Sequence, residues 1–372
     1  MSMLKSNGPV LTAVGALGGL MLSGLLASPV AAASLEVIAN SLESPRGLAF
    51  SPVGVLYVTE AGRGGDGACI QSGSGSEVCY GATGGVTRIW KGEQQRIASG
   101  LPSLALPDGS EATGPHDIVF NQIGSAQIVI GLGASPSERD TLGEVGKSFG
   151  TLISAFTDKR ARTVGDVVVY EETSNPDGGE LDTNPYGVAI QSGKRAIADA
   201  GGNSLLSMDT VGNISTLAVF PERLVDAPPF LGLPPGTQIP MESVPNSVAI
   251  GPDGAYYVGE LTGFPFPVGA ARVYRVVPGA APEVLVEGFT NIIDIAFATD
   301  GSLYVLEYAK NSLLSGDPTG ALTRISPDGS RTLIVSEGLI APTGVAIDST
   351  GEIYVSNNSA TVGEGQVVRV VP

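Results

Sequence analysis

The chain repeats one pattern of apolar and polar positions six times. Each copy reads roughly Pro-x-Gly-Val-Ala-Ile, continues through a turn that ends in glycine, and closes with a run such as Leu-Tyr-Val; the copies begin at Pro45, Pro115, Pro185, Pro245, Ile292 and Pro342. In five copies the turn glycine stands nine positions after the first residue, and in the Pro185 copy it stands one earlier, at Gly193. Self-similarity of this regularity is typical of a repeat architecture.

Alternation and turn residues divide each copy into strands. In the fourth unit we expect strands at 247–250, 255–260, 272–277 and 283–287, with the turn at 252–254 between the first two. Four short antiparallel strands in each of six units predict an all-β, six-bladed β-propeller. A pair of β-sandwiches is the alternative, but it does not account for six copies of one pattern.

The two ends of the chain predict how the ring closes. The sixth unit runs through 366–370 and then lacks a fourth strand, whereas residues 35–42 have the form of the fourth strands at 96–101 and 333–339. An N-terminal strand that completes the last blade would remove an exposed sheet edge. The sequence therefore predicts a single propeller domain over 34–372.

Residues 1–33 have the pattern of an export signal: Lys5 precedes an uncharged apolar stretch from Val10 to Ala27, and Ala31 to Ala33 form a small-residue cleavage site. An uncleaved membrane anchor is the alternative, because the apolar stretch is near the length that spans a bilayer. We expect a secreted or periplasmic monomer.

Composition agrees with a β-rich globular domain. The 372 residues include 52 glycines and 26 prolines, and 42% are hydrophobic against 15% charged, which favours a large core and many turns over helices or disorder. The net charge of −17 argues against nucleic acid or an anionic membrane as a partner.

Cys69 and Cys79 flank a Gly/Ser-rich loop. In an exported protein this pair predicts a disulfide that restrains the loop, although two free thiols remain the alternative. No second cysteine pair or neighbouring histidine completes a metal site.

Long connections are expected on one face of the ring, here called the top face. In a propeller, the start of the first strand, the end of the second, the loop to the third and the link to the next blade all emerge there. The long segments 61–85, 132–149, 222–243, 261–270, 309–319 and 358–365 fall in these connections, and long loops on a rigid scaffold are where binding is expected. The opposite face should carry short turns.

The residue six positions after each turn glycine is acidic or an amide in five units: Glu60, Asp199, Glu260, Glu307 and Asn357. Oxygen ligands from several blades suit a divalent cation, with Ca²⁺ the best match. The structural alternative is that these side chains accept hydrogen bonds from neighbouring turns and keep the rim soluble.

Arg46, His116, Tyr186 and Asn246 stand just before the first strands and are predicted to converge on the mouth of the central channel as ligand-binding residues. His116, the only histidine, is a candidate catalytic acid or base; the alternative is a packed histidine bonded to Asp117 or a backbone carbonyl. Phosphate-loop and serine-nucleophile motifs are absent from the sequence.

Glu260, Phe264 and Phe266 lie in the segment Gly259-Glu-Leu-Thr-Gly-Phe-Pro-Phe-Pro267. Two aromatic rings on a stiff backbone suit a flat apolar ligand. The alternative is a hydrophobic plug that packs over the adjoining blade.

Several segments together resemble the ScyD/ScyE family over essentially the whole mature chain. They are residues 62–67 with the cysteine loop, Glu111 to Asp117, Asn175 to Gly179, Asn184 to Gly187, Ala198 to Asn203 and Gly259 to Pro267. The resemblance implies an exported, NHL-like propeller associated with synthesis of the pigment scytonemin, and it implies no established catalytic residue.

Two function hypotheses follow. The first is an exported module that binds a small apolar or aromatic ligand, or a protein partner, on its top face. The second is an enzyme similar to lactonase and lyase propellers, in which Glu60, Asp199, Glu260 and Glu307 hold a divalent cation and His116 transfers protons.

Overall fold

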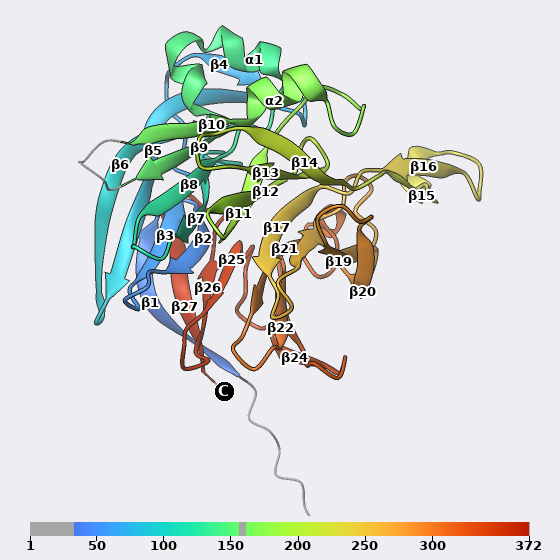
Figure 1. Ribbon diagram of the computed structural model, residues 1–372. Coiled ribbons are helices and arrows are strands. Elements are labelled where there is room, and N and C mark those ends of the chain that lie inside the picture. Colours follow the sequence, from blue (N-terminus) through green and yellow to red (C-terminus); the bar gives the residue numbers. More distant parts are fainter. Residues whose placement is uncertain (1–32, 156–160, 372) are drawn as a thin grey trace, which may run out of the picture. The chain divides into compact units, whose positions relative to one another are not determined.

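Six four-stranded antiparallel blades form a β-propeller in the computed structural model, which describes residues 33–155 and 161–371 (Figure 1). The predicted signal segment lies almost wholly outside the described residues. Among those described, no helix is long and apolar enough to span a membrane.

The first three blades follow the chain in order. Blade 1 holds β2 (Pro45–Phe50), β3 (Leu56–Glu60), β5 (Glu77–Trp90) and β6 (Glu93–Ala105), with β4 (Cys69–Gln71) added beside β5. Blade 2 holds β7 (Pro115–Phe120), β8 (Ala126–Ile130), β9 (Thr151–Ala155) and β10 (Arg162–Asp166). Blade 3 holds β11 (Pro185–Gln191), β12 (Lys194–Asp199), β13 (Ser204–Met208) and β14 (Ile214–Val219).

The remaining blades complete the ring. Blade 4 holds β17 (Pro245–Ile250), β18 (Tyr256–Glu260), β19 (Ala271–Val276) and β20 (Glu283–Phe289), close to the strands expected for this unit. Blade 5 holds β21 (Ile292–Phe297), β22 (Leu303–Glu307), β23 (Ala321–Ile325) and β24 (Arg331–Val335). Blade 6 holds β25 (Gly344–Ile347), β26 (Ile353–Asn357), β27 (Gly365–Val371) and the N-terminal strand β1 (Ser34–Leu42).

The predicted closure of the ring is confirmed. Strand β1 pairs with β27 from Ser34 opposite Val371 to Leu42 opposite Gly365, so the first and last described strands are neighbours in one sheet. The hydrophobic core lies between successive blades. One cluster, for example, packs Ala198 and Leu205 of blade 3 against Val258 and Tyr274 of blade 4.

Short helices in the long connections correct the expectation that the chain is too turn-rich for helices. Helix α1 (Pro136–Thr141) begins with Pro136 and is capped by Ser135, whose hydroxyl accepts a hydrogen bond from the Glu138 amide. Helix α2 (Val167–Ser174) is capped by Asp166 and ends at Asn175 in the left-handed conformation. The 3₁₀ turns are η1 (Gly143–Ser148), η2 (Pro229–Leu231) and η3 (Leu313–Ser315). Local capping thus outweighs overall composition.

The predicted disulfide between Cys69 and Cys79 is confirmed, and the two residues face each other across β4 and β5. The hairpin they close contacts the helical connection of blade 2, because the Gly73 amide donates to the Gly133 carbonyl and the Gln71 amide donates to Glu138 Oε2. The disulfide therefore helps to join the top-face connections of blades 1 and 2.

Replacing Cys69 and Cys79 together with alanine should destabilise this hairpin. A cross-link closing a loop of this size contributes about 3 kcal/mol by restricting the unfolded chain. We expect the melting temperature to fall by roughly 5 °C. Calorimetry with and without reductant checks this: the wild type should lose stability on reduction and the double variant should not respond. A wild type that is insensitive to reductant would contradict the prediction.

Candidate functional site

The mouth of the central channel brings together the predicted residues Arg46, His116, Tyr186 and Asn246. The hollow here has a volume of about 10 Å³, room for no more than about one water molecule. The rings of His116 and Tyr186 stack with centroids 4.3 Å apart. Arg46 Nη2 donates to the Ala112 carbonyl at 2.7 Å. The convergence was predictable from the repeat, but the space left at this point is smaller than a drug-sized or indole-sized molecule requires.

His116 is buried, with 2% of its surface exposed, and its Nδ1 lies 3.2 Å from the Pro185 carbonyl oxygen. Because a carbonyl only accepts, Nδ1 carries the proton of the neutral ring. Burial, with a smaller contribution from Arg46, lowers the pKa of His116 to about 3. The imidazole is therefore neutral near pH 7, and the packed alternative describes its contacts; a catalytic role stays a prediction.

Two further carboxyls line the channel from opposite sides of the ring, Asp117 in blade 2 and Asp294 in blade 5. Asp117 accepts from the Val188 amide at 2.8 Å and Asp294 accepts from the Val345 amide at 2.7 Å, so each ties its own blade to the next. Burial raises the pKa of Asp294 to about 7 and, with the Asp294 charge, raises that of Asp117. Both carboxyls therefore hold neighbouring blades together through hydrogen bonds to the backbone.

Each carboxylate or amide predicted at the ends of the second strands has protein partners of its own. Glu60 accepts from the Thr87 hydroxyl and the Glu43 amide, Asp199 from the Thr183 hydroxyl and the Asn184 amide, Glu307 from the Thr290 amide, and Asn357 from the Ile340 amide. The only three ligating atoms of His, Cys, Asp or Glu within 4.8 Å of one another in the described chain belong to Cys69, Glu77 and Cys79, two of which form the disulfide. The five predicted residues are therefore not gathered at one point.

Glu260, a predicted ligand-binding and metal-binding residue, also makes structural contacts. It forms a buried ion pair with Arg223 and accepts from the Ser243 hydroxyl at 2.7 Å and the Tyr274 hydroxyl at 3.1 Å. Arg223 opens β15 (Arg223–Asp226), which pairs with β16 (Gln238–Met241). The ion pair thus anchors the β15–β16 hairpin, which projects from the link between blades 3 and 4 (Figure 1).

Exposed apolar side chains gather on this hairpin and on the neighbouring 261–270 loop. We call these six residues the apolar flap: Leu224, Phe230, Leu231, Leu233, Phe264 and Val268, of which Phe230 is 66% and Phe264 is 42% exposed. Phe264 lies edge-on to Phe230 at 6.3 Å and to the partly buried Phe266 at 6.4 Å. The sequence predicted Phe264 and Phe266 as ligand contacts and the segment from Leu224 to Pro235, which holds Phe230, as a second apolar flap nearby. The two segments come together where the Gly263 amide donates to the Glu242 carbonyl.

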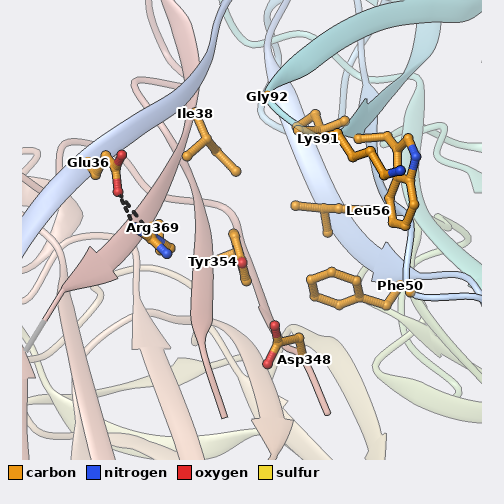
Figure 2. Close-up of a pocket in the computed structure, with 12 residues that line it drawn as sticks. Glu36, Ile38, Phe50, Leu56, Lys91, Gly92, Asp348, Tyr354 and Arg369 are labelled. Atoms are coloured by element: carbon orange, nitrogen blue, oxygen red, sulfur yellow. Dashed lines mark hydrogen bonds and ion pairs between the residues drawn. The ribbon is translucent and has the colours of Figure 1, made fainter. Parts of the chain in front are cut away.

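A larger hollow lies on the face where only short turns were expected, at the seam between blades 1 and 6 (Figure 2). Its volume is about 280 Å³, and Phe50, Leu56 and Tyr354 form its apolar walls. Lys91 lies 5.5 Å from the centre of the Trp90 ring at its edge. Glu36 of β1 and Arg369 of β27 form an ion pair beside it. The second strand of one blade and the closure strand of another build this hollow together, so no single repeat predicted it.

The sequence interpretation missed the connection that carries α2, between blades 2 and 3. It holds Glu171 on the helix and Asp177 and Asp182 after it, close to Asp199. The available signal was local: Asp166 is a helix-capping residue type, and the eight residues that follow it end at Asn175-Pro-Asp-Gly-Gly, so the sequence marks both the start and the end of a short helix.

By sequence, neither a protein-family model nor a curated protein matches this chain. By structure, it is similar to a protein of unknown function from Bacteroides thetaiotaomicron, with 8% identity, 91% of this chain and 76% of that chain covered, and a TM-score of 0.54. A gluconolactonase from Xanthomonas campestris matches with 10% identity, 91% and 90% coverage and a TM-score of 0.53. Regucalcin from Agrobacterium tumefaciens, described as a calcium-binding protein, matches with 14% identity, 91% and 95% coverage and a TM-score of 0.50. These similarities support the propeller fold.

Proposed function

We propose that this chain is an exported propeller of the ScyD/ScyE type that binds a small apolar aromatic compound through the apolar flap on its top face. The observation that carries the proposal is the flap itself. Large apolar side chains that gather on one exposed surface, among them Phe230 and Phe264, mark an interaction site far more often than scattered ones do.

The geometry of the rings supports an aromatic ligand. Phe264 stands edge-on to both Phe230 and Phe266, which is the arrangement in which aromatic rings attract one another. A flat ligand ring that joins this group gains the same contacts. The Arg223–Glu260 ion pair holds the hairpin in place, so less ordering is needed on binding. The family resemblance assigns such a ligand to extracytoplasmic steps of pigment synthesis.

The experiment is a melting-temperature screen with indolic and phenolic compounds. We expect wild-type protein to be stabilised by a subset, and the Phe230→Ala, Phe264→Ala double variant to lose at least about tenfold in affinity, because two aromatic contacts of about 1 kcal/mol each are removed. Ile123→Ala is the matched control, since Ile123 is 90% exposed on a turn of the opposite face.

A third variant separates the flap from the seam hollow. Trp90→Ala alters the edge of that hollow and leaves the flap intact. Ligand binding that survives the flap double variant but is lost in Trp90→Ala would reject the flap as the site and place the compound at the seam.

The alternative function is a divalent-cation-dependent enzyme of the lactonase or lyase kind with His116 as acid or base. Its support is the fold shared with the Xanthomonas gluconolactonase and with regucalcin. The separate partners of Glu60, Glu260 and Glu307 favour the binding function instead.

A further inference from the structure

Four carboxylates form a group on the top face beside the apolar flap. We call Glu171, Asp177, Asp182 and Asp199 the acidic cluster. Asp199 is fully buried and Glu171 is 1% exposed, while Asp177 and Asp182 are half-buried. In residues 33–155 and 161–371, no ion pair involves any of the four. Buried and half-buried carboxyl groups therefore collect here without a protein cation to balance them.

Glu171 is the most unusual member. Its Oε1 atom is buried and has no hydrogen-bond partner in the described structure. Its other oxygen faces Asp199 across Gly202: a methyl group added to Gly202 would lie 3.0 Å from Glu171 Oε2 and 3.2 Å from Asp199 Oδ2. Buried carboxylates in proteins are normally met by donors or by a cation. In the part of the chain that the structure describes, Glu171 Oε1 is met by neither.

The other members differ in how firmly they are held. Asp199 Oδ1 accepts from the Asn184 and Gly202 amides, and Oδ2 accepts from the Thr183 hydroxyl at 2.5 Å. Asp177 accepts from the Gly179 amide and from Asn203 Nδ2. Asp182, by contrast, is half-buried on the loop that follows α2. Asp199, which accepts from three donors, thus faces Glu171, whose Oε1 has no partner in the described structure. Asp177 and Asp182 lie on the loop that follows α2.

From this geometry we propose that the acidic cluster binds a divalent cation, with Ca²⁺ the best suited, between Glu171 and Asp199. Calcium takes six to eight oxygen ligands in adaptable geometry, and carboxylates on a loop together with water supply them. No three of these carboxylates lie mutually within 4.8 Å. Binding would draw Asp177 and Asp182 toward the other two.

This site differs from the cation site predicted at the channel rim. It shares Asp199 with that prediction, but its other ligands come from the single connection between β10 and β11 rather than from several blades. The bound ion would fasten this connection to the end of β12. Glu242 follows β16 and contacts Gly263 of the 261–270 loop. Its pKa is raised by burial and then by the charges of Glu222 and Asp177, so the acidic cluster lies next to the flap.

The test is the melting temperature of the mature chain, freed of metal by chelator, as CaCl₂ is added at pH 7.5. Wild-type protein should gain roughly 5 °C at saturation, the size expected when ligand exceeds its dissociation constant by about a hundredfold. KCl at matched ionic strength should give a much smaller change, since it only screens the charges. Glu171→Gln should lose most of the gain, whereas Glu172→Gln, the exposed neighbour on the same helix, should keep it.

A folding control and a second variant distinguish loss of calcium binding from loss of the fold. Glu171→Gln preserves shape and removes like-charge repulsion, so in chelator it should melt no lower than the wild type, which confirms that it folds. Gly202→Ala keeps all charges but places a methyl group between Glu171 and Asp199, and it should also lose the calcium effect. No calcium-dependent shift in the wild type, or an equal shift in Glu171→Gln, would overturn the proposal. Either failure leaves the flap hypothesis standing, because its ligand contacts none of these carboxylates.

Discussion

A chain that lacks residues 34–42 should fail to form a stable ring. Strand β1 supplies the outer strand of blade 6, buries Ala39 and Leu42, and pairs Glu36 with Arg369. Its removal exposes the backbone edge of β27 and the apolar side chains behind it. We expect a loss of at least about 5 kcal/mol, which corresponds to a fall of roughly 10 °C in melting temperature, or to aggregation through the open edge.

Circular-dichroism melting and size-exclusion chromatography check this expectation. The control is a chain that begins at Ser34, which keeps β1 and should melt like the longer protein. Leu42→Ala provides a measurable intermediate if the truncated chain is insoluble, because emptying this buried position costs about 2–5 kcal/mol. A truncated chain that is monomeric and melts with the control would show that the ring does not depend on the closure strand.

The protein should be more stable at pH 5 than at pH 8. Burial raises the pKa of Asp294 and of Glu307 to about 7. A carboxyl with a higher pKa in the folded chain binds its proton more tightly when folded, so its contribution is lost as pH rises from about 4 through 7. His116, with a pKa lowered to about 3, acts in the opposite direction below about 6.5. It is outweighed by these two carboxyls and by other acids whose pKa is raised, among them Asp117, Glu171 and Asp182.

The net effect between pH 5 and pH 8 is at least about 3 kcal/mol, or at least roughly 5 °C in melting temperature, measured in chelator so that bound cations do not contribute. Asp294→Asn should flatten the profile, because the amide keeps an acceptor oxygen for the Val345 amide and never ionises. A wild type that loses stability on acidification to pH 5, or an Asp294→Asn profile with the wild-type slope, would refute this account of the channel carboxyls.

The repeat made the fold predictable. Each copy carries its own turn glycine and alternating strands, so local signals agree with the global architecture at every blade. The closure strand was predictable because its pattern matches the other fourth strands. The mouth of the channel followed as well, since Arg46, His116, Tyr186 and Asn246 occupy equivalent positions.

Side-chain contacts that differ from one repeat to the next were harder to predict. Glu60 and Asp199 stand at equivalent positions, yet the first accepts from Thr87 and Arg96, and the second from Thr183 and Asn184. Equivalent positions share a place in the blade but not a common point in space, so periodicity alone did not show whether they meet. Contacts between loops of different blades, such as Phe230 with Phe264, depend on the folded course of each insertion.

Amide hydrogen exchange, measured with and without an aromatic compound from the melting screen, distinguishes binding at the top face from binding at the seam. If the apolar flap is the binding site, the ligand should slow exchange in residues 223–241 and 261–270 and leave residues 36–38, 89–92 and 348–354 unchanged. Slower exchange at the seam segments, with none on the flap, would contradict the proposed function.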